Sequence, residues 1–183
     1  MALQLTLAGW AVLEVGLRVR ERLEGRGGAA RDRATRALIA GTVAIAVAVA
    51  AVTASRSTAP QIAGPGRTTG LIVMWLGLGI RVWAIATLGR AFRTTVEVDP
   101  GQAVVTSGPY RWVRHPSYSG LLLIIAGFGL GTGSWLALAI CALLPLPALL
   151  WRMHVEEAEL TAVLGDRYRV YQRDTERLIP GLW

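Results

Sequence analysis

Residues 116–151 read PSYSGLLLIIAGFGLGTGSWLALAICALLPLPALLW, a run of 36 residues without a charged side chain. As one helix this run would be about 54 Å long, whereas the hydrocarbon core of a bilayer is about 30 Å thick. Its centre, Gly127–Ser134, is rich in glycine, which favours a break in the helix. The run therefore predicts a tight hairpin of two transmembrane helices, at 117–130 and 134–151, with the second helix kinked by its prolines.

Three further apolar segments precede this run, at 2–17, 37–55 and 69–89. The chain is 53% hydrophobic, which is typical of a membrane protein when the apolar residues are gathered in segments of this length. Together with the hairpin, the segments predict an all-α polytopic membrane protein with five transmembrane helices. We expect residues 1–183 to form a single integral membrane domain.

The C-terminal region, residues 152–183, is charged and amphipathic. Its pattern predicts one helix at 154–164 and helical structure again at 166–175. Gly165 stands between them as a plausible helix C-cap.

Arginine is distributed unevenly between the connections. All 19 basic residues are arginine, and they concentrate before the second apolar segment, before the hairpin and in the C-terminal region. The connection at 56–68 holds only two of them. The positive-inside rule then places the N-terminus outside and the C-terminus in the cytoplasm, as expected for an integral protein of a prokaryotic inner membrane, with the lipid bilayer as its partner.

Two other classes of protein find little support in the composition. The net charge of +7 is compatible with nucleic-acid binding, but the arginines lie between apolar segments rather than in a compact basic domain, so no nucleic-acid partner is predicted. Cys141 is the only cysteine, and the sequence has no HxxxH pattern and no aspartate cluster. We therefore predict no disulfide within the chain and no metal site.

A polar motif stands immediately before the apolar run, at Gly108–Gly120, with the sequence GPYRWVRHPSYSG. The run is followed by Arg152 and by an acidic cluster, Glu156, Glu157 and Glu159. If the run doubles back as a hairpin, both polar clusters lie on the same side of the membrane. Two polar clusters that meet at a membrane surface favour a functional site over a scaffold.

His115 and Pro116 predict a helix start within this motif. Proline suits the first turn of a helix, where free N–H groups and the positive end of the helix dipole face an anion. With Ser117 and Tyr118 these residues predict a small polar ligand pocket. Arg111 and Arg114 of the motif have two equally good interpretations: they belong to this site, or they are anchors that reach to lipid headgroups.

Charged side chains elsewhere have more than one interpretation. Arg152 and Glu156 are spaced i, i+4, so they form either an ordinary salt bridge or the two poles of a site. Glu14 and Arg81 lie within apolar segments, where a charge is costly unless it is paired. We expect these two side chains to pair with each other across the first and third segments, in a structural role.

The chain resembles the isoprenylcysteine carboxyl methyltransferase family of integral membrane enzymes, from roughly residue 69 to the end. The resemblance rests on four pieces of sequence: VVTSGPYRWVRHPSYSG at 104–120, Arg152-x-x-x-Glu156-Glu157-x-x-Leu160, Gly165-x-x-Tyr168-x-x-Tyr171 and Arg177-Leu-Ile-Pro-Gly181.

This resemblance implies a methyltransferase that uses S-adenosylmethionine at the cytoplasmic membrane face, with C-terminal helices covering the cofactor pocket. The acceptor would be lipophilic or membrane-associated, as in the protein-S-isoprenylcysteine O-methyltransferases. Arg152 would face the acceptor, and Glu157 is the second candidate catalytic residue. The implied cofactor contacts are Gln102, Ala103, Val104, Val105, Tyr110, His115, Pro116, Ser117, Tyr118 and Glu156. At the position of Gln102 the family usually has histidine.

The chemistry of this cofactor agrees with these side chains. Tyrosine faces suit its sulfonium, a glutamate suits its ammonium, and the helix start suits its carboxylate. A carboxylate acceptor would need no general base, and Arg152 would orient it bidentately. An amine, thiol or hydroxyl acceptor would need Glu157, His154 or a tyrosine to take a proton.

Two alternative functions stay open at this point. Membrane sterol reductases, which use NADPH, resemble the same C-terminal half and share an Arg-His-Pro-x-Tyr-x-Gly run. A non-catalytic membrane component would need no cofactor.

Overall fold

The computed structural model describes residues 2–23, 30–55, 62, 64–89, 101 and 103–182. Within these residues the structure is helical, with an isolated parallel β-bridge between Val113 and Glu176. A short 3-10 helix, η2 (Gly108–Arg111), precedes the fourth of seven α-helices. These are α1 (Ala2–Leu23), α2 (Ala30–Ser55), α3 (Gly66–Leu88), α4 (Pro116–Gly131), α5 (Trp135–Leu143), α6 (Leu146–Leu164) and α7 (Asp166–Asp174).

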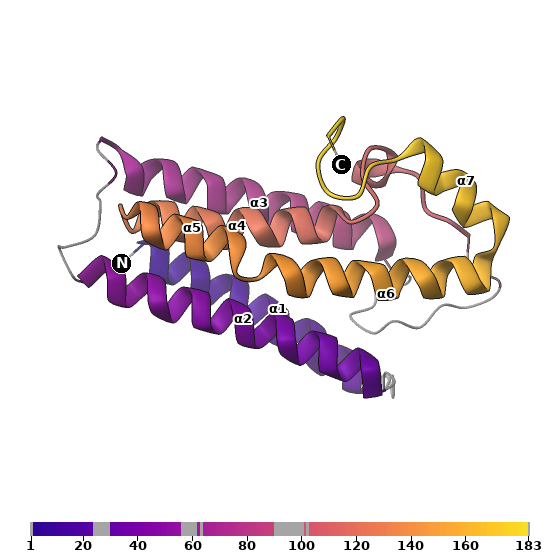
Figure 1. Ribbon diagram of the computed structural model, residues 1–183, viewed down its shortest axis with the longest axis horizontal. Coiled ribbons are helices and arrows are strands. Elements are labelled where there is room, and N and C mark those ends of the chain that lie inside the picture. The colour runs from indigo at the N-terminus through magenta and orange to yellow at the C-terminus, as the bar shows by residue number, and fades with distance from the viewer. Residues whose placement is uncertain are drawn as a thin grey trace.

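The helices form an elongated bundle (Figure 1). α3 packs closely against α4, and α4 packs against α5. α2 packs against α5 and α6, and α1 packs against α3 and α4. The N-terminus lies near one end of the long axis, and α7 lies at the other end, with the C-terminal segment beside the end of α3 (Figure 1).

The all-α membrane class predicted from the sequence is confirmed. Among the described residues, four helical stretches are long and apolar enough to cross a membrane: Ala2–Val19, Arg33–Ala54, Gly66–Leu88 and Trp135–Leu164. The last stretch combines α5 and α6. α4 is a shorter apolar helix of 16 residues.

Glycines bring α3 and α4 into backbone contact. A Cβ added at Gly77 would lie 2.6 Å from the carbonyl oxygen of Gly120, and one added at Gly70 would lie 2.4 Å from the backbone of Gly131. Since real side chains do not approach backbone so closely, only glycine is compatible with this spacing. Small residues are the usual means of close helix packing in a membrane, where lipid offers no hydrophobic drive for association.

The chain breaks within the glycine-rich centre of the apolar run, between α4 and α5, close to the predicted position. Gly127 and Gly129 lie inside α4 and provide close contacts. The chain turns only at Thr132 and Gly133, where Gly133 has a φ of +80°. Ser134 then begins α5 by accepting a hydrogen bond from the Ala137 amide.

The second predicted helix of the hairpin, 134–151, is interrupted at its prolines, as predicted, but it continues beyond residue 151. It is divided into α5 and α6, and the break falls next to Pro145, because proline removes a helix hydrogen bond. α6 then continues through Arg152 to Leu164 without interruption. The helix predicted at 154–164 is thus the continuation of α6. Gly165 ends it with a φ of +60°, as expected.

Candidate active site

The polar motif before α4 is held in place by the C-terminal segment. The amides of Arg114 and His115 donate hydrogen bonds to the carbonyls of Glu176 (2.7 Å) and Arg177 (3.0 Å). The hydroxyl of Ser119 donates to the carbonyl of Leu178 at 2.6 Å. The motif and the end of the chain, about 60 residues apart in sequence, therefore form one unit.

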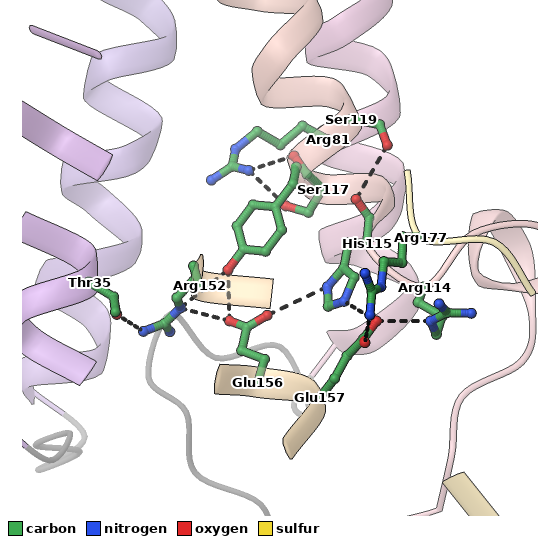
Figure 2. A network of polar contacts seen from close by, with 11 residues as sticks. Thr35, Arg81, Arg114, His115, Ser117, Ser119, Arg152, Glu156, Glu157 and Arg177 are labelled. Atoms are coloured by element: carbon green, nitrogen blue, oxygen red, sulfur yellow. Dashed lines mark hydrogen bonds and ion pairs between the residues drawn. The ribbon is translucent and has the colours of Figure 1, made fainter. Parts of the chain in front are cut away.

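Glu157 is the centre of a buried ion cluster (Figure 2). Its Oε1 accepts from Arg114 Nε at 2.9 Å and lies 3.2 Å from His115 Nε2. Its Oε2 lies 3.2 Å from Arg177 Nη2. One α6 carboxylate thus ties together the motif and the C-terminal segment.

Arg114 is an internal connector. Besides Glu157, its Nη1 donates to the carbonyls of Gln172 and Thr175. The interpretation of Arg114 as a lipid anchor is therefore wrong. Arg111, in contrast, is exposed and lies over the Trp112 ring at 3.8 Å from its centroid, as expected for an interfacial residue.

Arg152 and Glu156 form the pair predicted from their spacing. Arg152 Nε donates to Glu156 Oε1 at 2.9 Å, and the Tyr118 hydroxyl donates to the same oxygen at 2.7 Å. Glu156 Oε2 lies 3.6 Å from His115 Nδ1 (Figure 2). The Arg152 side chain is only 1% exposed, so this pair is not a surface salt bridge.

Thr35 of α2 also belongs to this cluster. It is buried, and its Oγ1 accepts from Arg152 Nη1 at 2.9 Å (Figure 2). Sequence reasoning missed Thr35 because it lies in an arginine-rich stretch that was treated as a connection, while α2 in fact begins at residue 30. α2 thus starts before its apolar part, and this N-terminal extension brings the Thr35 hydroxyl to Arg152.

Glu14 and Arg81 pair as predicted. Arg81 Nε donates to Glu14 Oε1 at 2.6 Å, and Trp10 Nε1 donates to the same oxygen at 3.0 Å. The sequence did not predict that Arg81 also donates through Nη1 to the carbonyl and the Oγ of Ser117, both at 2.8 Å (Figure 2).

The start of α4 is only partly available to a ligand. The amides of Tyr118 and Ser119 both donate to the carbonyl of His115, at 2.9 and 3.2 Å. Pro116 has no amide hydrogen. The expected set of free N–H groups is therefore smaller than the sequence suggested.

A cavity of about 680 Å³ connects these clusters. This volume is within the range of small-molecule sites. Pro116 and Glu157 do not line it, and Gln102 lies outside the described residues. The cavity brings together the other predicted residues, namely Ala103, Val104, Val105, Tyr110, His115, Ser117, Tyr118, Arg152 and Glu156.

The cavity has one polar end and one apolar wall. Apolar side chains of α1 and α2, such as Leu7, Val43 and Val47, form the wall. The rest of the lining is rich in charge. Five arginines face two carboxylates there: Arg18, Arg36, Arg81, Arg114 and Arg152 against Glu14 and Glu156.

Tyrosines of the C-terminal region complete the polar end. The hydroxyl of Tyr171 donates to the carbonyl of Tyr110 at 2.7 Å, which links α7 to η2. Burial raises the pKa of Tyr171 to about 12, and it raises the pKa values of Tyr110 and Tyr168 further still. These phenols therefore stay protonated at neutral pH.

Fold and site together define a class: a membrane-type helical bundle with a charged cavity at one end, closed by a C-terminal helical region. The isoprenylcysteine carboxyl methyltransferase (ICMT) family profile matches residues 70–162, about half of the chain. The chain belongs to this family.

Several known proteins are similar to the chain. The protein-S-isoprenylcysteine O-methyltransferase of Schizosaccharomyces pombe is 29% identical over 62% of this chain and 49% of its own length. That of Tribolium castaneum is 34% identical over 61% of this chain and 40% of its own length. The uncharacterized protein YpbQ of Bacillus subtilis is 37% identical over 28% of this chain and 35% of its own. The chain thus spans about half or less of each.

A solved structure has the same fold. It is that of the eukaryotic intramembrane Ras methyltransferase ICMT, with a TM-score of 0.59 and 31% identity. The match covers 63% of this chain and 42% of that one.

Proposed function

We propose that this protein is a methyltransferase that uses S-adenosylmethionine and methylates a carboxylate on a lipophilic or membrane-associated acceptor. One observation carries the proposal: a single cavity joins the cluster of Arg152, Glu156, Tyr118 and His115 to an apolar wall of α1 and α2. The names of the similar proteins agree with this reaction.

The residues present fit the cofactor. Glu156 is a partly exposed carboxylate that lines the cavity and suits an ammonium. The rings of Tyr110 and Tyr118, which also line the cavity, suit a sulfonium cation. Residues 103–105 line the cavity beside Tyr110 and complete the cofactor side.

When bound, S-adenosylmethionine would supply a methyl group carried on a sulfonium sulfur. An acceptor carboxylate oxygen would form the new C–O bond as the C–S bond breaks, the electron pair of that C–S bond would stay on sulfur, and no proton would be transferred. Such a displacement depends mainly on the alignment of the two reactants. Arg152 orients the acceptor carboxylate, because a guanidinium can bind both carboxylate oxygens. Tyr118, Glu156 and Thr35 hold the guanidinium in place.

A carboxylate acceptor is favoured because the cavity lining, as far as the structure describes it, offers no well-placed base. Both ring nitrogens of His115 are directed at carboxylate oxygens. Glu157 is bound by cationic groups and does not line the cavity, and His154 is exposed outside it. We propose that Glu157 is a positioning residue rather than a base. The excess of arginine along the lining also suits an anionic acceptor.

The apolar wall supports a lipophilic acceptor that reaches the cavity from the bilayer. In this arrangement α1, α2, α3, α4 and the combined α5–α6 cross the membrane, with the N-terminus outside and the C-terminus in the cytoplasm of a prokaryotic cell. The positive-inside rule supports this orientation. The C-terminal region, residues 152–183, then covers the cofactor side of the cavity.

Ligand-dependent melting of the purified protein in detergent tests the cofactor. S-adenosylhomocysteine should raise the thermal midpoint, because a ligand at 100 times its Kd adds about 2.7 kcal/mol to folding stability. NADPH should leave the midpoint unchanged. A shift with NADPH and none with S-adenosylhomocysteine would replace the proposal with a reductase.

Methyl transfer to defined acceptors tests whether the acceptor group is a carboxylate. An S-isoprenylcysteine with a free carboxylate should accept a labelled methyl group from S-adenosylmethionine. The matched compound with an amidated carboxylate should accept none. Equal labelling of both compounds would contradict a carboxylate acceptor.

A further inference from the structure

The pair of Glu14 and Arg81 does more than join two helices. The Arg81 side chain is 6% exposed and that of Glu14 is 14% exposed. An ion pair that only joined α1 to α3 would need one contact between them. The Arg81 guanidinium instead donates to two helices: Nε donates to Glu14 of α1, and Nη1 donates to Ser117 of α4.

The Ser117 contact fixes the first turn of α4. Arg81 Nη1 lies 2.8 Å from both the carbonyl oxygen and the Oγ of Ser117. A backbone acceptor and a side-chain acceptor on one residue hold that residue in position as well as in orientation. The next residue, Tyr118, donates to Glu156, and its ring stacks on His115 with 5.6 Å between centroids.

Glu14 in turn orients Arg81. Its Oε1 accepts from Arg81 Nε and from Trp10 Nε1, so the carboxylate is held from its own helix while it holds the guanidinium. α1 lies outside the residues that match the family profile, 70–162. No residue of the Ala2–Val19 stretch is buried, so α1 meets the bundle through partly exposed side chains such as Leu7 and Trp10.

We propose that Glu14 and Arg81 are positioning residues for the site: Arg81, oriented by Glu14 of α1, fixes the first turn of α4 and thereby the contact of Tyr118 with Glu156. The inference rests on the proposed function, since Glu156 is the assigned cofactor carboxylate. It makes α1 a working part of the active site, although the profile does not include that helix.

Two variants separate positioning from helix joining. Arg81→Lys keeps a cation opposite Glu14, but one ammonium lacks the fork that reaches both Glu14 and Ser117. The exchange variant E14R/R81E keeps an ion pair between α1 and α3, but a carboxylate at position 81 cannot donate to Ser117. Both variants should bind S-adenosylhomocysteine at least 10-fold more weakly than the wild type, while the exchange variant recovers most of the melting temperature lost in Arg81→Met.

Leu3→Ala is the matched control. Leu3 belongs to α1 and packs against Gly131 at the opposite end of α4, so its truncation loosens α1 without touching the Arg81 contacts. It should lower the thermal midpoint and leave cofactor affinity within about 2-fold. If affinity falls in proportion to the midpoint in all four variants, the pair is only a structural tether and the proposal is wrong. Full recovery of affinity for S-adenosylhomocysteine in E14R/R81E would also show that the pair is only a structural tether.

A direct contact with the acceptor is the other outcome that contradicts the proposal, since Glu14 and Arg81 both line the cavity. In that case Arg81→Lys would raise the acceptor KM and leave cofactor affinity unchanged. Failure of the proposed function gives a different result, because then the wild type itself does not bind S-adenosylhomocysteine. Hydrogen exchange of the peptide at 114–120 still tests positioning in that case: it should accelerate in Arg81→Lys and not in Leu3→Ala.

Discussion

α3 and α4 pack against each other through glycines, whereas the glycines of α1 and α2 make no such contact, although all four helices are apolar. A Cβ at Gly77 of α3 would lie 2.6 Å from a backbone oxygen of α4, so these helices are in backbone contact. A Cβ at Gly16 of α1 or Gly41 of α2 would meet nothing within 4 Å. The glycines of α1 and α2 therefore do not bring these helices into backbone contact with the bundle.

This difference favours a rigid role for α3 and α4 and an adaptable role for α1 and α2. Backbone contact leaves little freedom, so the α3–α4 pair can hold the first turn of α4 at one position. Side-chain contacts can be rearranged at low cost, which suits a wall that accepts a lipophilic molecule. The family profile covers the rigid pair and leaves out α1 and α2.

Arg152 contacts both Thr35 of α2 and Tyr118 of α4. Its variants should have the largest effect on methyl transfer. Arg152→Ala should lower methyl transfer by at least about 100-fold, which corresponds to about 2.7 kcal/mol. It should also destabilise the fold, because the guanidinium is buried and its loss leaves Glu156 without its arginine partner. Arg152→Lys should recover stability better than turnover, since lysine cannot bind a carboxylate bidentately.

Thr35→Val is the control for this prediction. It removes the α2 hydroxyl that accepts from Arg152 and keeps the guanidinium and its contact with Glu156. Its effect on turnover should be 10-fold or less. Full activity in Arg152→Ala, measured beside its melting temperature, would remove Arg152 from the site.

Glu156→Gln should come next, with an effect on the cofactor rather than on the acceptor. Loss of a charge-assisted contact to an ammonium costs roughly 1.5–3 kcal/mol, so the Kd for S-adenosylhomocysteine should rise by more than about 10-fold in calorimetry. Glu159→Gln, an exposed position on the same helix, is the matched control and should leave the Kd unchanged. Equal Kd values for both variants would mean that Glu156 does not contact the cofactor.

Glycine substitutions compare the two kinds of packing directly. Gly77→Ala should destabilise the protein by roughly 1–3 kcal/mol, because the new methyl group forces α3 and α4 apart. Gly79→Ala on the same helix, and Gly41→Ala on α2, face open space and should change stability by less than about 1 kcal/mol. Thermal midpoints of the three variants in one detergent suffice. Similar midpoints for Gly77→Ala and Gly79→Ala would show that backbone contact is not essential.

The smallest effect is expected on the surface of α7. Arg169 pairs with Asp166 at 3.0 Å, but their side chains are 60% and 89% exposed. Arg169→Ala should therefore change stability by under about 1 kcal/mol. A larger loss in thermal melting would mean that the α7 surface is covered in the membrane-bound protein.

The local pattern of residues was enough for several features. The i, i+4 spacing of Arg152 and Glu156 predicted their contact, and the intramembrane positions of Glu14 and Arg81 predicted their pairing. Gly165 marked the end of α6 correctly. Each of these predictions depends on neighbours along one helix or on the rule that a charge in an apolar segment needs a partner.

Other features depend on segments far apart in the chain. The sequence alone could not show that Glu157 binds Arg114 and Arg177. It also could not show which helices the glycines at 127 and 129 pack against. Thr35 carried no signal of its contact with Arg152, because a single hydroxyl has no partner until two helices meet.

Residue order thus determines the helical membrane class, the two polar clusters and their return to one end, since hydrophobic length and turn residues act locally. The three-dimensional packing determines which arginine supports which carboxylate, where the glycines allow backbone contact, and how α1 reaches the site through Glu14 and Arg81. Distances between side chains depend on how whole helices cross, and no short-range pattern contains that information.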